Sequence, residues 1–256
     1  PYNKKSILMF KEGILDKILY RIKKLIPKSV FNFFSPLYHA GLAWAGALLY
    51  GFPSRSMKVI GVTGTKGKST TVFLVSKLLE GAGYPTAAIG SLGFKIKDKE
   101  WPNNLKMTMP GRFKLQKFLA QAKKAGCKYV VLEVTSEGIK QKRHLGIKFD
   151  CAVFTNLHKE HLESHGSFEN YYKAKQELFK KTSNIHVLNA DSEYVSLFSK
   201  FPAEKKVFYS LKNYNFQTRL QGDFNKSNIL AAAETVKNYG VDQETIQKVL
   251  DKIEVV

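Results

Sequence analysis

Residues 61–71 are Gly-Val-Thr-Gly-Thr-Lys-Gly-Lys-Ser-Thr-Thr, a glycine-rich run between two segments of different character. The apolar residues 57–62 before it predict a buried strand. The apolar spacing from Lys68 to Ala82 predicts a helix that ends at Gly83. A strand, a glycine-rich turn and a helix in this order are typical of a phosphate-binding loop. Backbone N–H groups and the helix N-terminus would then face phosphate oxygens.

The loop predicts binding of ATP together with Mg²⁺. Lys68 would reach the β- and γ-phosphates, and Ser69 would ligate the metal. The strict Walker pattern fails, because Val62 stands where that pattern has its first glycine. A purely structural turn is the alternative interpretation. The nucleotide-binding residues predicted from the loop are Gly64, Thr65, Lys66, Gly67, Lys68, Ser69 and Thr70.

Strand and helix patterns alternate from the loop onward. Further strands are predicted at 86–89, 129–134, 151–154 and 185–188, and further helices at 113–125, 171–181 and 224–238. This alternation predicts an α/β fold with a mainly parallel sheet and helices on both faces. We expect one central domain over residues 57–256, preceded by a helical, apolar and basic segment over residues 1–56.

The N-terminal segment has two parts. Apolar residues recur at helical spacing from Ile14 to Ile26, interleaved with lysine and arginine, which predicts a basic amphipathic helix. Residues 29–54 then contain no charged side chain. Three alternatives follow: a helical hairpin packed on the central domain, membrane-surface contact through residues 14–54, or a membrane-spanning segment.

Charge and cysteine content indicate the kinds of partner and the cellular compartment. Lys and Arg outnumber Asp and Glu by 41 to 21, giving a formal net charge of +20. That excess favours anionic partners such as nucleotides, phosphorylated substrates, nucleic acid or a membrane surface, unless it only reflects a lysine-rich proteome. Cys127 and Cys151 lie in or beside apolar strand patterns, so we expect free thiols in a reducing cytosol. We expect a cytoplasmic monomer, with membrane association as the alternative, and no nucleic-acid partner, because no nucleic-acid-binding motif occurs.

The loop resembles the Gly-Val-Thr-Gly-Thr-x-Gly-Lys-Ser/Thr-Thr loop of the Mur ligase superfamily, and further segments match in the same order. Leu132–Ser136 resembles the family's Glu-Val-Ser-Ser segment, which implies that Glu133 helps to hold magnesium. A carboxylate at the end of a strand faces the ligand crevice of an open α/β sheet, which supports that role. A surface or ion-paired glutamate is the alternative.

Residues 155–166 resemble the family's Thr-Asn-Leu-x-x-Asp-His-Leu-x-x-His-Gly segment, with Glu160 in place of the aspartate. The resemblance implies that His161 approaches magnesium and that Asn156 belongs to the nucleotide site. A zinc site formed by His158, His161 and His165 is the alternative.

Two helical segments complete the resemblance. Residues 172–179 resemble the segment with the family's carbamylated lysine, which maps to Lys175, although an exposed lysine is the alternative. Carbamylation requires a depressed lysine pKa. Residues 222–232 resemble a further helix of the family. The resemblance implies that Asn225 and Asn228 contact the adenine nucleotide. Helix capping by Asp223 with ordinary surface asparagines is the alternative there.

The closest resemblance within the family is to enzymes that add the third residue to UDP-N-acetylmuramoyl dipeptide. It rests on residues 90–93, 108–110 and 141–143, with departures at Ser91, Met109 and Glu137. It implies that the UDP-muramoyl peptide is contacted by Thr108, Thr135, Gln141 and Arg143.

The resemblance implies an ATP-dependent amide-bond ligase. The γ-phosphate of ATP would convert a substrate carboxylate into an acyl phosphate, which an amino acid's amine then attacks. Lys68, Glu133, His161 and Lys175 would be catalytic, and Ser69, Glu133 and His161 would ligate Mg²⁺. The resemblance does not cover residues 1–56. The family's C-terminal domain, which binds the incoming amino acid, has no counterpart in residues 1–256, so we expect nucleotide binding with little ligation from this chain alone. The alternatives are a folylpolyglutamate- or cyanophycin-type ligase and a non-enzymatic basic protein that binds membranes or polyanions.

Overall fold

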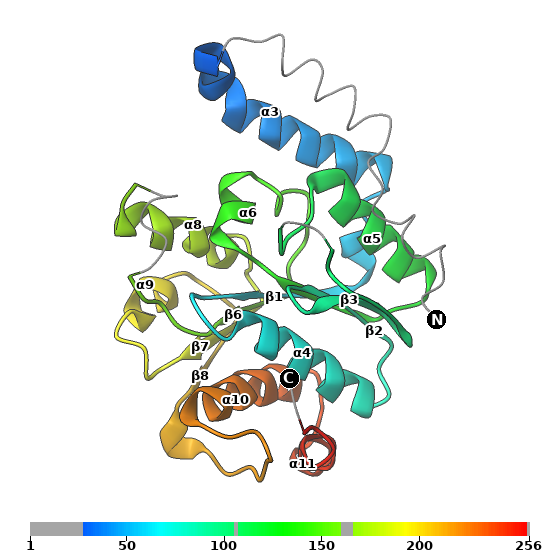
Figure 1. Ribbon diagram of the computed structural model, residues 1–256, viewed down its shortest axis with the longest axis vertical. Coiled ribbons are helices and arrows are strands. Elements are labelled where there is room, and N and C mark those ends of the chain that lie inside the picture. Colours follow the sequence, from blue (N-terminus) through cyan, green and yellow to red (C-terminus); the bar gives the residue numbers. More distant parts are fainter. Residues whose placement is uncertain (1–27, 105–106, 160–165, 255–256) are drawn as a thin grey trace.

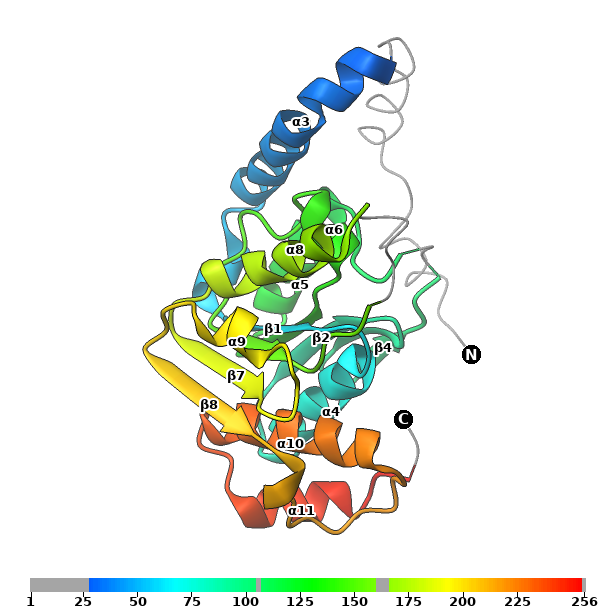
Figure 2. The same cartoon turned by 90° about the vertical axis from the view of Figure 1, so that its left-hand side faces the viewer.

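An eight-stranded sheet forms the centre of the molecule, with helices on both faces (Figures 1 and 2). The computed structural model describes residues 28–104, 107–159 and 166–254. The strand order is β4-β3-β2-β5-β1-β6-β7-β8, and among the described strands only β3 runs opposite to the rest, pairing antiparallel with β2 and with β4. The strands are β1 (Lys58–Thr63), β2 (Thr86–Gly90), β3 (Gly93–Ile96), β4 (Lys99–Trp101), β5 (Tyr129–Glu133), β6 (Cys151–Phe154), β7 (Ile185–Asn189) and β8 (Lys205–Tyr209).

The helices divide between the two faces of the sheet and confirm the predicted α/β architecture. Helices α4 (Lys68–Gly81), α10 (Asp223–Lys237) and α11 (Gln243–Leu250) cover one face. Helices α5 (Arg112–Lys124), α8 (Phe168–Lys180) and α9 (Val195–Ser199) cover the other. The remaining described helices are α3 (Lys28–Leu49), η2 (Pro53–Ser56), α6 (Ser136–Lys140) and η3 (Leu211–Asn213).

Strand β1 shows why the central strands are continuously apolar. Its alternate residues point to opposite faces, so Ile60 packs towards α4 and α10 while Val59 packs towards the other layer. Gly61 lies under α8, where an added Cβ would be 2.8 Å from Leu178 Cδ1. This glycine therefore permits close packing of α8 on the sheet and makes no turn of its own.

The sequence prediction missed the two edges of the sheet. The β3–β4 hairpin and β8 were not predicted, nor were the short helices α9 and α11. Strand β8 shows the reason: Tyr209 is its one fully buried residue, and Lys205, Lys206 and Phe208 are exposed. An edge strand with one solvated face lacks the apolar run by which the central strands are recognised.

Helix α3 projects from the body of the molecule (Figures 1 and 2). It continues through Pro36. A proline removes one backbone donor, and packing of the C-terminal half on α5 holds the helix. Within the described ranges, no helix combines the length and apolar content that crossing a membrane requires. The amphipathic helix predicted at 14–26 lies outside the described residues.

Candidate functional site

The phosphate loop follows β1 at the carboxyl edge of the sheet and leads into α4. Gly67, the residue before α4, has a left-handed φ of 78°, and a Cβ there would lie 2.2 Å from Asn228 Oδ1. At Gly64 an added Cβ would lie 2.0 Å from Thr155 Oγ1. Both glycines are thus required because α10 and the segment after β6 approach the loop closely.

The segment after β6 fixes the shape of the loop. Thr155 Oγ1 donates to the Lys66 carbonyl at 2.7 Å, and the Lys66 N–H donates to Asn156 Oδ1 at 2.8 Å. The Thr65 N–H donates to the Asn156 carbonyl at 2.9 Å. Asn156 therefore lies beside the glycine-rich loop, and its observed contacts are with the loop backbone.

Lys175 is buried beneath the loop. Its side chain is 1% exposed, and its Nζ donates to the Gly64 carbonyl at 2.7 Å. Burial and, secondarily, the charge of Lys68 hold the pKa of Lys175 well below its ordinary value of 10.5, while Glu133 acts in the opposite direction. The alternative of an exposed lysine is therefore wrong. A buried lysine with a depressed pKa is a stronger nucleophile, because more of it is neutral at physiological pH.

Glu133 joins the end of β5 to the start of α4. It is 3% exposed, and its Oε2 accepts hydrogen bonds from Ser69 Oγ at 2.9 Å and from the Ser91 N–H at 2.8 Å. The alternative of a surface glutamate is wrong. A carboxylate and a hydroxyl this close offer the oxygen donors that Mg²⁺ prefers, so both side chains fit the metal implied by the resemblance.

The two histidine predictions remain open. His161 lies outside the described residues, as does His165. Of the three histidines in the zinc alternative, the structure describes only His158, whose backbone N–H donates to Thr65 Oγ1 at 2.9 Å. No group of three or more potential metal-ligating side chains of His, Cys, Asp or Glu occurs in the part of the chain that the structure describes.

Lys68 lies close to its own loop, where its Nζ donates to the Thr65 carbonyl at 2.8 Å. The Thr65 hydroxyl lies 3.1 Å from the Tyr171 hydroxyl, which links the loop to α8. Loop, β5 and α8 thus converge on one cleft of about 490 Å³. The cleft is lined by Thr65, Lys66, Gly67, Lys68, Ser69, Ser91, Thr108, Glu133, Thr135, Ser136, Glu137, Tyr171 and Lys175.

The four predicted substrate residues divide into two pairs. Thr108 and Thr135 line the cleft, where Thr108 Oγ1 lies 2.9 Å from Ser91 Oγ. Thr135 Oγ1 accepts the Gly138 N–H at 3.0 Å and so caps α6. Gln141 and Arg143 are not among the residues lining the cleft.

Arg143 is 6% exposed and holds in place the chain segment that follows Thr108. It donates to the Met109 carbonyl and, at 2.7 Å, to Gln141 Oε1. Arg112, at the start of α5, donates to the Gln141 carbonyl at 2.5 Å. Burial, with a further contribution from Arg143, lowers the pKa of Arg112 to about 10. Arg143 therefore holds the segment that carries Thr108, and Arg112 links the start of α5 to Gln141.

Helix α10 brings Asn228 to the loop. Asn228 is 6% exposed, and Thr71 Oγ1 donates to its Oδ1 at 3.5 Å. Asn225 is half-buried one turn earlier and donates to the Gln221 carbonyl at 2.8 Å. Asp223 makes no capping bond, since Gly222 occupies the cap position and Asp223 Oδ1 accepts from Lys226. The capping alternative is therefore wrong.

Sequence reasoning missed three polar residues at the site: Thr155, Ser136 and Tyr171. Tyr171 lies one helical turn before Lys175, and its ring centroid is 4.5 Å from Lys175 Nζ. The i, i+4 spacing of these residues on a predicted helix was the available signal. Thr155 and Ser136 stand inside segments that were already matched, so position within the motif could have indicated them.

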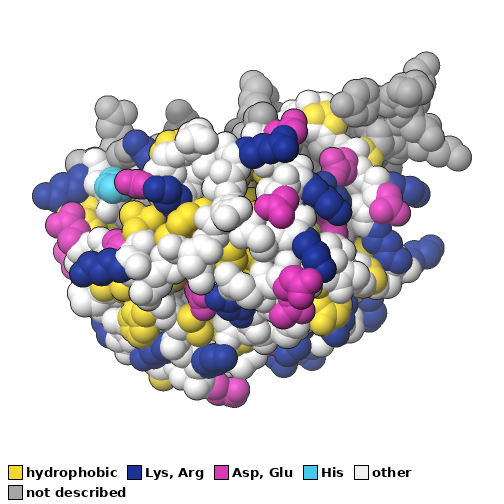
Figure 3. All heavy atoms as spheres, turned by 90° about the horizontal axis from the view of Figure 1, so that it is seen from below, with side chains coloured by type: hydrophobic (Ala, Val, Ile, Leu, Met, Phe, Trp, Pro, Cys, Tyr) yellow, Lys and Arg dark blue, Asp and Glu magenta, His cyan; other side chains and the backbone are white. Residues whose placement is uncertain are grey.

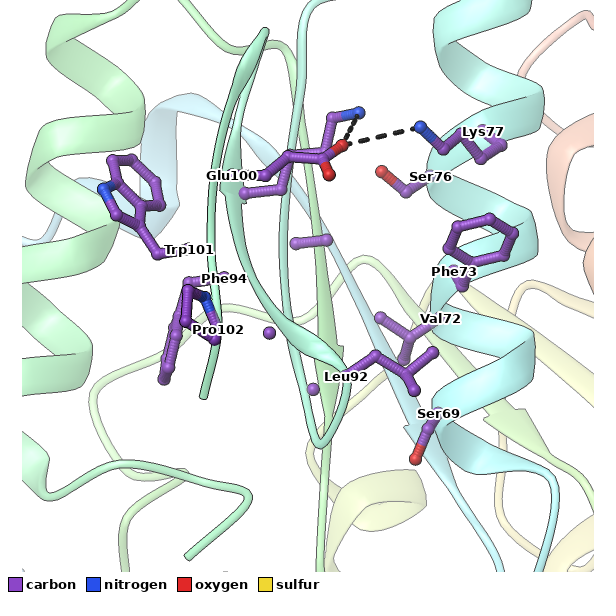
Figure 4. Close-up of a pocket in the computed structure, with 14 residues that line it drawn as sticks. Ser69, Val72, Phe73, Ser76, Lys77, Leu92, Phe94, Glu100, Trp101 and Pro102 are labelled. Carbon is purple, nitrogen blue, oxygen red and sulfur yellow. Dashed lines mark hydrogen bonds and ion pairs between the residues drawn. The ribbon is translucent and has the colours of Figure 1, made fainter. Parts of the chain in front are cut away.

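A second hollow adjoins the cleft at Ser69 (Figure 4). Its volume is about 350 Å³, and it lies between α4 and the β3–β4 hairpin. Figure 4 shows Val72, Phe73 and Lys77 on α4 opposite Leu92 and Glu100. Its ionic groups pair with one another, because Glu100 Oε1 lies 2.7 Å from Lys95 Nζ and 3.5 Å from Lys77 Nζ. The hollow is thus mainly apolar.

Residues 62–215 match the family model of the Mur ligase middle domain. The chain is 32% identical to a UDP-N-acetylmuramyl-tripeptide synthetase of Roseiflexus sp. (strain RS-1), covering 85% of this chain and 51% of the relative. It is 36% identical to a UDP-N-acetylmuramoyl-L-alanyl-D-glutamate–2,6-diaminopimelate ligase of Gloeobacter violaceus, covering 77% of this chain and 45% of the relative. The chain thus spans about half the length of the curated relatives it matches.

Solved structures give the same assignment. A UDP-N-acetylmuramoyl-L-alanyl-D-glutamate–2,6-diaminopimelate ligase matches with a TM-score of 0.70 and 27% identity, covering 77% of this chain and 46% of that one. FolC of E. coli, solved with DHPP and ADP, matches with a TM-score of 0.64 and 17% identity over 84% of this chain and 61% of that one. The second likeness concerns the fold alone.

Proposed function

Because this chain belongs to the Mur ligase family, we propose that it is the ATP-binding core of an amide-bond ligase. Its reaction would add an amino acid to a UDP-N-acetylmuramoyl peptide in the synthesis of peptidoglycan precursors. The observation that carries this proposal is the burial of Lys175 and Glu133 around the phosphate loop. Buried ionisable groups beside a phosphate loop are costly to fold and are typical of a catalytic centre.

Nucleotide binding would rest on the loop and on α10. Backbone N–H groups of residues 64–70 would bind phosphate oxygens, with Lys68 neutralising charge on the transferred phosphate. Asn228, in contact with Gly67, and Asn225 would lie on the nucleotide side of the loop. Ser69 and Glu133 would hold Mg²⁺, which supplies charge neutralisation when bound, and the family pattern adds His161 as a third ligand.

The reaction would proceed in two steps. A substrate carboxylate oxygen attacks the γ-phosphorus of ATP, the bond to ADP breaks, and an acyl phosphate forms. The amine of the amino acid then attacks the acyl carbon, the amide bond forms, and phosphate leaves with the electron pair of the broken C–O bond. In both steps, the residues of this chain would position the reactants and stabilise developing negative charge.

Lys175 would act as a carbamate. Its neutral Nζ would add to the carbon of CO₂ and lose a proton, giving an N-carboxylate beside the loop. Burial of the amine favours the neutral form that this addition requires. A ¹³C NMR spectrum in ¹³C-bicarbonate should show a carbamate signal for the wild-type chain and none for Lys175→Met. A signal of equal intensity in both proteins contradicts the carbamate.

Two of the four predicted substrate residues would contact the substrate, and the other two would support the segment that presents one of them. Thr108 and Thr135 would contact the UDP-muramoyl peptide from the cleft wall. Gln141 and Arg143 would hold the segment that presents Thr108, in addition to any contact with substrate that the family pattern implies. Thr108→Val should therefore raise KM for that substrate and leave ATP affinity unchanged.

The decisive experiment measures ATP-dependent phosphate release and amide formation with UDP-muramoyl dipeptide and candidate amino acids, alongside equilibrium binding of ATP with Mg²⁺. Dihydrofolate with glutamate is the parallel substrate pair for the folylpolyglutamate alternative. We expect the wild-type chain to bind ATP and the Lys68→Ala variant to lose that binding. We also expect the muramoyl nucleotide, and not dihydrofolate, to stimulate phosphate release. Unchanged ATP binding in Lys68→Ala, or stimulation by dihydrofolate only, overturns the proposal.

We further propose a cytoplasmic monomer, since the high net positive charge disfavours self-association. Sedimentation at several protein concentrations tests the monomer. Salt-sensitive binding to polyanions without ATP affinity would instead favour the non-enzymatic alternative.

A further inference from the structure

Helix α3 buries its small side chains and exposes its large apolar ones. Its small residues Ala43, Gly46 and Ala47 are buried against the body. Ala47 meets Gly146, where an added Cβ would lie 2.5 Å from the Ala47 Cβ. Leu37, Leu48 and Leu49 are 71%, 70% and 65% exposed, and Trp44 is 50% exposed. A solvated helix normally buries its large apolar side chains, so this arrangement marks an interaction surface.

The exposed side chains of α3 form one stripe. Leu37, Trp44 and Leu48 follow one another at spacings of seven and four residues, which places them on the same side of a helix. No charged residue occurs from Ser29 to Ser54, so Lys28, the first residue of α3, is the single charged residue of this helix. Helix α3 itself projects from the body of the molecule, away from the sheet (Figure 2).

Cations gather where the stripe ends. A hollow of about 270 Å³ has Trp44 and Phe52 in its wall together with Arg55, Lys148 and Lys181, and none of its described lining residues is acidic. The Arg55 guanidinium lies 4.3 Å from the Phe52 ring centroid. The adjoining hollow adds Lys128 and Lys58, and Lys58 Nζ pairs at 2.6 Å with Asp150, the one carboxylate among the described lining residues. By contrast, on the face seen in Figure 3 lysine and arginine are intermixed with aspartate and glutamate.

We propose that α3 docks this protein on an anionic lipid surface. The leucines and Trp44 would enter the boundary between headgroups and acyl chains, where tryptophan is favoured. Arg55, Lys148 and Lys181 would meet the lipid phosphates. The helix would lie in the interface, consistent with the finding that no described helix is long and apolar enough to cross a membrane.

The net charge of the chain favours a lipid surface over a second copy of the chain as the binding partner of α3. Two copies paired through α3 would bring together molecules that each carry a formal net charge of +20. An anionic surface instead attracts those charges, and each basic residue near it contributes to binding. The sequence that precedes α3 adds four more cations between Ile14 and Ile26: Lys17, Arg21, Lys23 and Lys24.

Cosedimentation of the 256-residue chain with vesicles tests the proposal. The vesicles contain either phosphatidylglycerol mixed with phosphatidylcholine or phosphatidylcholine alone. We expect at least about tenfold tighter binding to the anionic vesicles, weakened by salt. The double variant Leu37→Asp, Leu48→Asp should bind at least about tenfold more weakly. Phe208→Asp, at a 50% exposed position on β8, is the matched control and should bind as the wild type does.

Tryptophan fluorescence locates the contact. The chain has two tryptophans, Trp44 and Trp101, so Trp101→Phe leaves Trp44 as the single reporter. Its emission should shift to shorter wavelength on anionic vesicles. Circular dichroism confirms that each variant is folded. Vesicle binding that is unaffected by the Leu37 and Leu48 substitutions, or no vesicle binding together with a concentration-dependent dimer that those substitutions abolish, overturns the proposal.

Discussion

The cleft and helix α3 depart from the usual burial rule in opposite directions. The cleft buries a lysine and a glutamate, Lys175 and Glu133, whereas α3 exposes large apolar residues such as Leu37 and Leu48. The buried polar groups are compensated inside the molecule, because Gly64, Ser69 and Ser91 supply their hydrogen bonds. The exposed leucines have no comparable coverage in the described residues. Compensated burial indicates polar groups that the fold itself holds in place, and uncompensated exposure indicates a surface for a partner.

The strongest test of the cleft changes one glycine. Gly67→Ala should lower nucleotide affinity about 100-fold, because its Cβ would displace Asn228 and with it the loop. Gly83→Ala is the matched control, since Gly83 has a similar φ of 80° and open space around it. The control should cost about 1 kcal/mol of stability and leave affinity unchanged. Equal loss of affinity in both variants would mean that the contact with Asn228 is irrelevant.

The packing of α3 is tested by two adjacent residues. Ala47→Leu should lower the free energy of unfolding by about 2 kcal/mol, because the larger side chain has no room against Gly146. Leu48→Ala should change it by less than about 0.5 kcal/mol, since Leu48 is 70% exposed. Urea denaturation measures both. A larger effect at Leu48 than at Ala47 would reverse the assigned orientation of the helix.

The charge of Glu133 can be removed with its hydrogen bonds retained. In Glu133→Gln the amide oxygen can still accept from Ser69 and Ser91, so the fold should persist. The Mg²⁺ concentration required for half-maximal ATP binding should rise about tenfold, because a neutral amide is a poorer ligand for this cation. Titration of Mg²⁺ at fixed ATP measures the change. An unaltered requirement would remove Glu133 from the metal site.

The smallest expected effect is a pH dependence of stability. Lys175 has a lowered pKa in the folded chain, so the unfolded chain binds more protons between that pKa and the ordinary value of 10.5. Its contribution to the free energy of unfolding therefore rises with pH across that window. Lys175→Met should remove this rise in CO₂-free buffer, whereas Lys180→Met, at an exposed position of the same helix, should retain it. Identical pH slopes in wild type and Lys175→Met would contradict the buried neutral amine.

Prediction from sequence succeeded where the pattern is local. The run from Gly61 to Thr71 combines a buried strand, a turn and a helix start within a few residues, so the strand–turn–helix unit followed from it, and the alternation of the later segments predicted the parallel sheet. The β3–β4 hairpin and β8 were missed because edge strands are solvated on one face. For the site, Thr108 and Thr135 lie at the cleft, whereas Gln141 and Arg143 lie behind it, and residue spacing alone does not distinguish these positions.

The sequence by itself determined the order of elements, the loop and the identity of the ionisable residues, because periodicity and glycine placement act over short distances along the chain. The tertiary structure decided their chemical state. Ser69 and Glu133 are 64 residues apart in sequence, yet they share a hydrogen bond. The low pKa of Lys175 arises mainly because its amine is buried beneath the loop, against the Gly64 carbonyl, 111 residues away in sequence. Solvation depends on atoms contributed by distant segments, so only the assembled fold determines it.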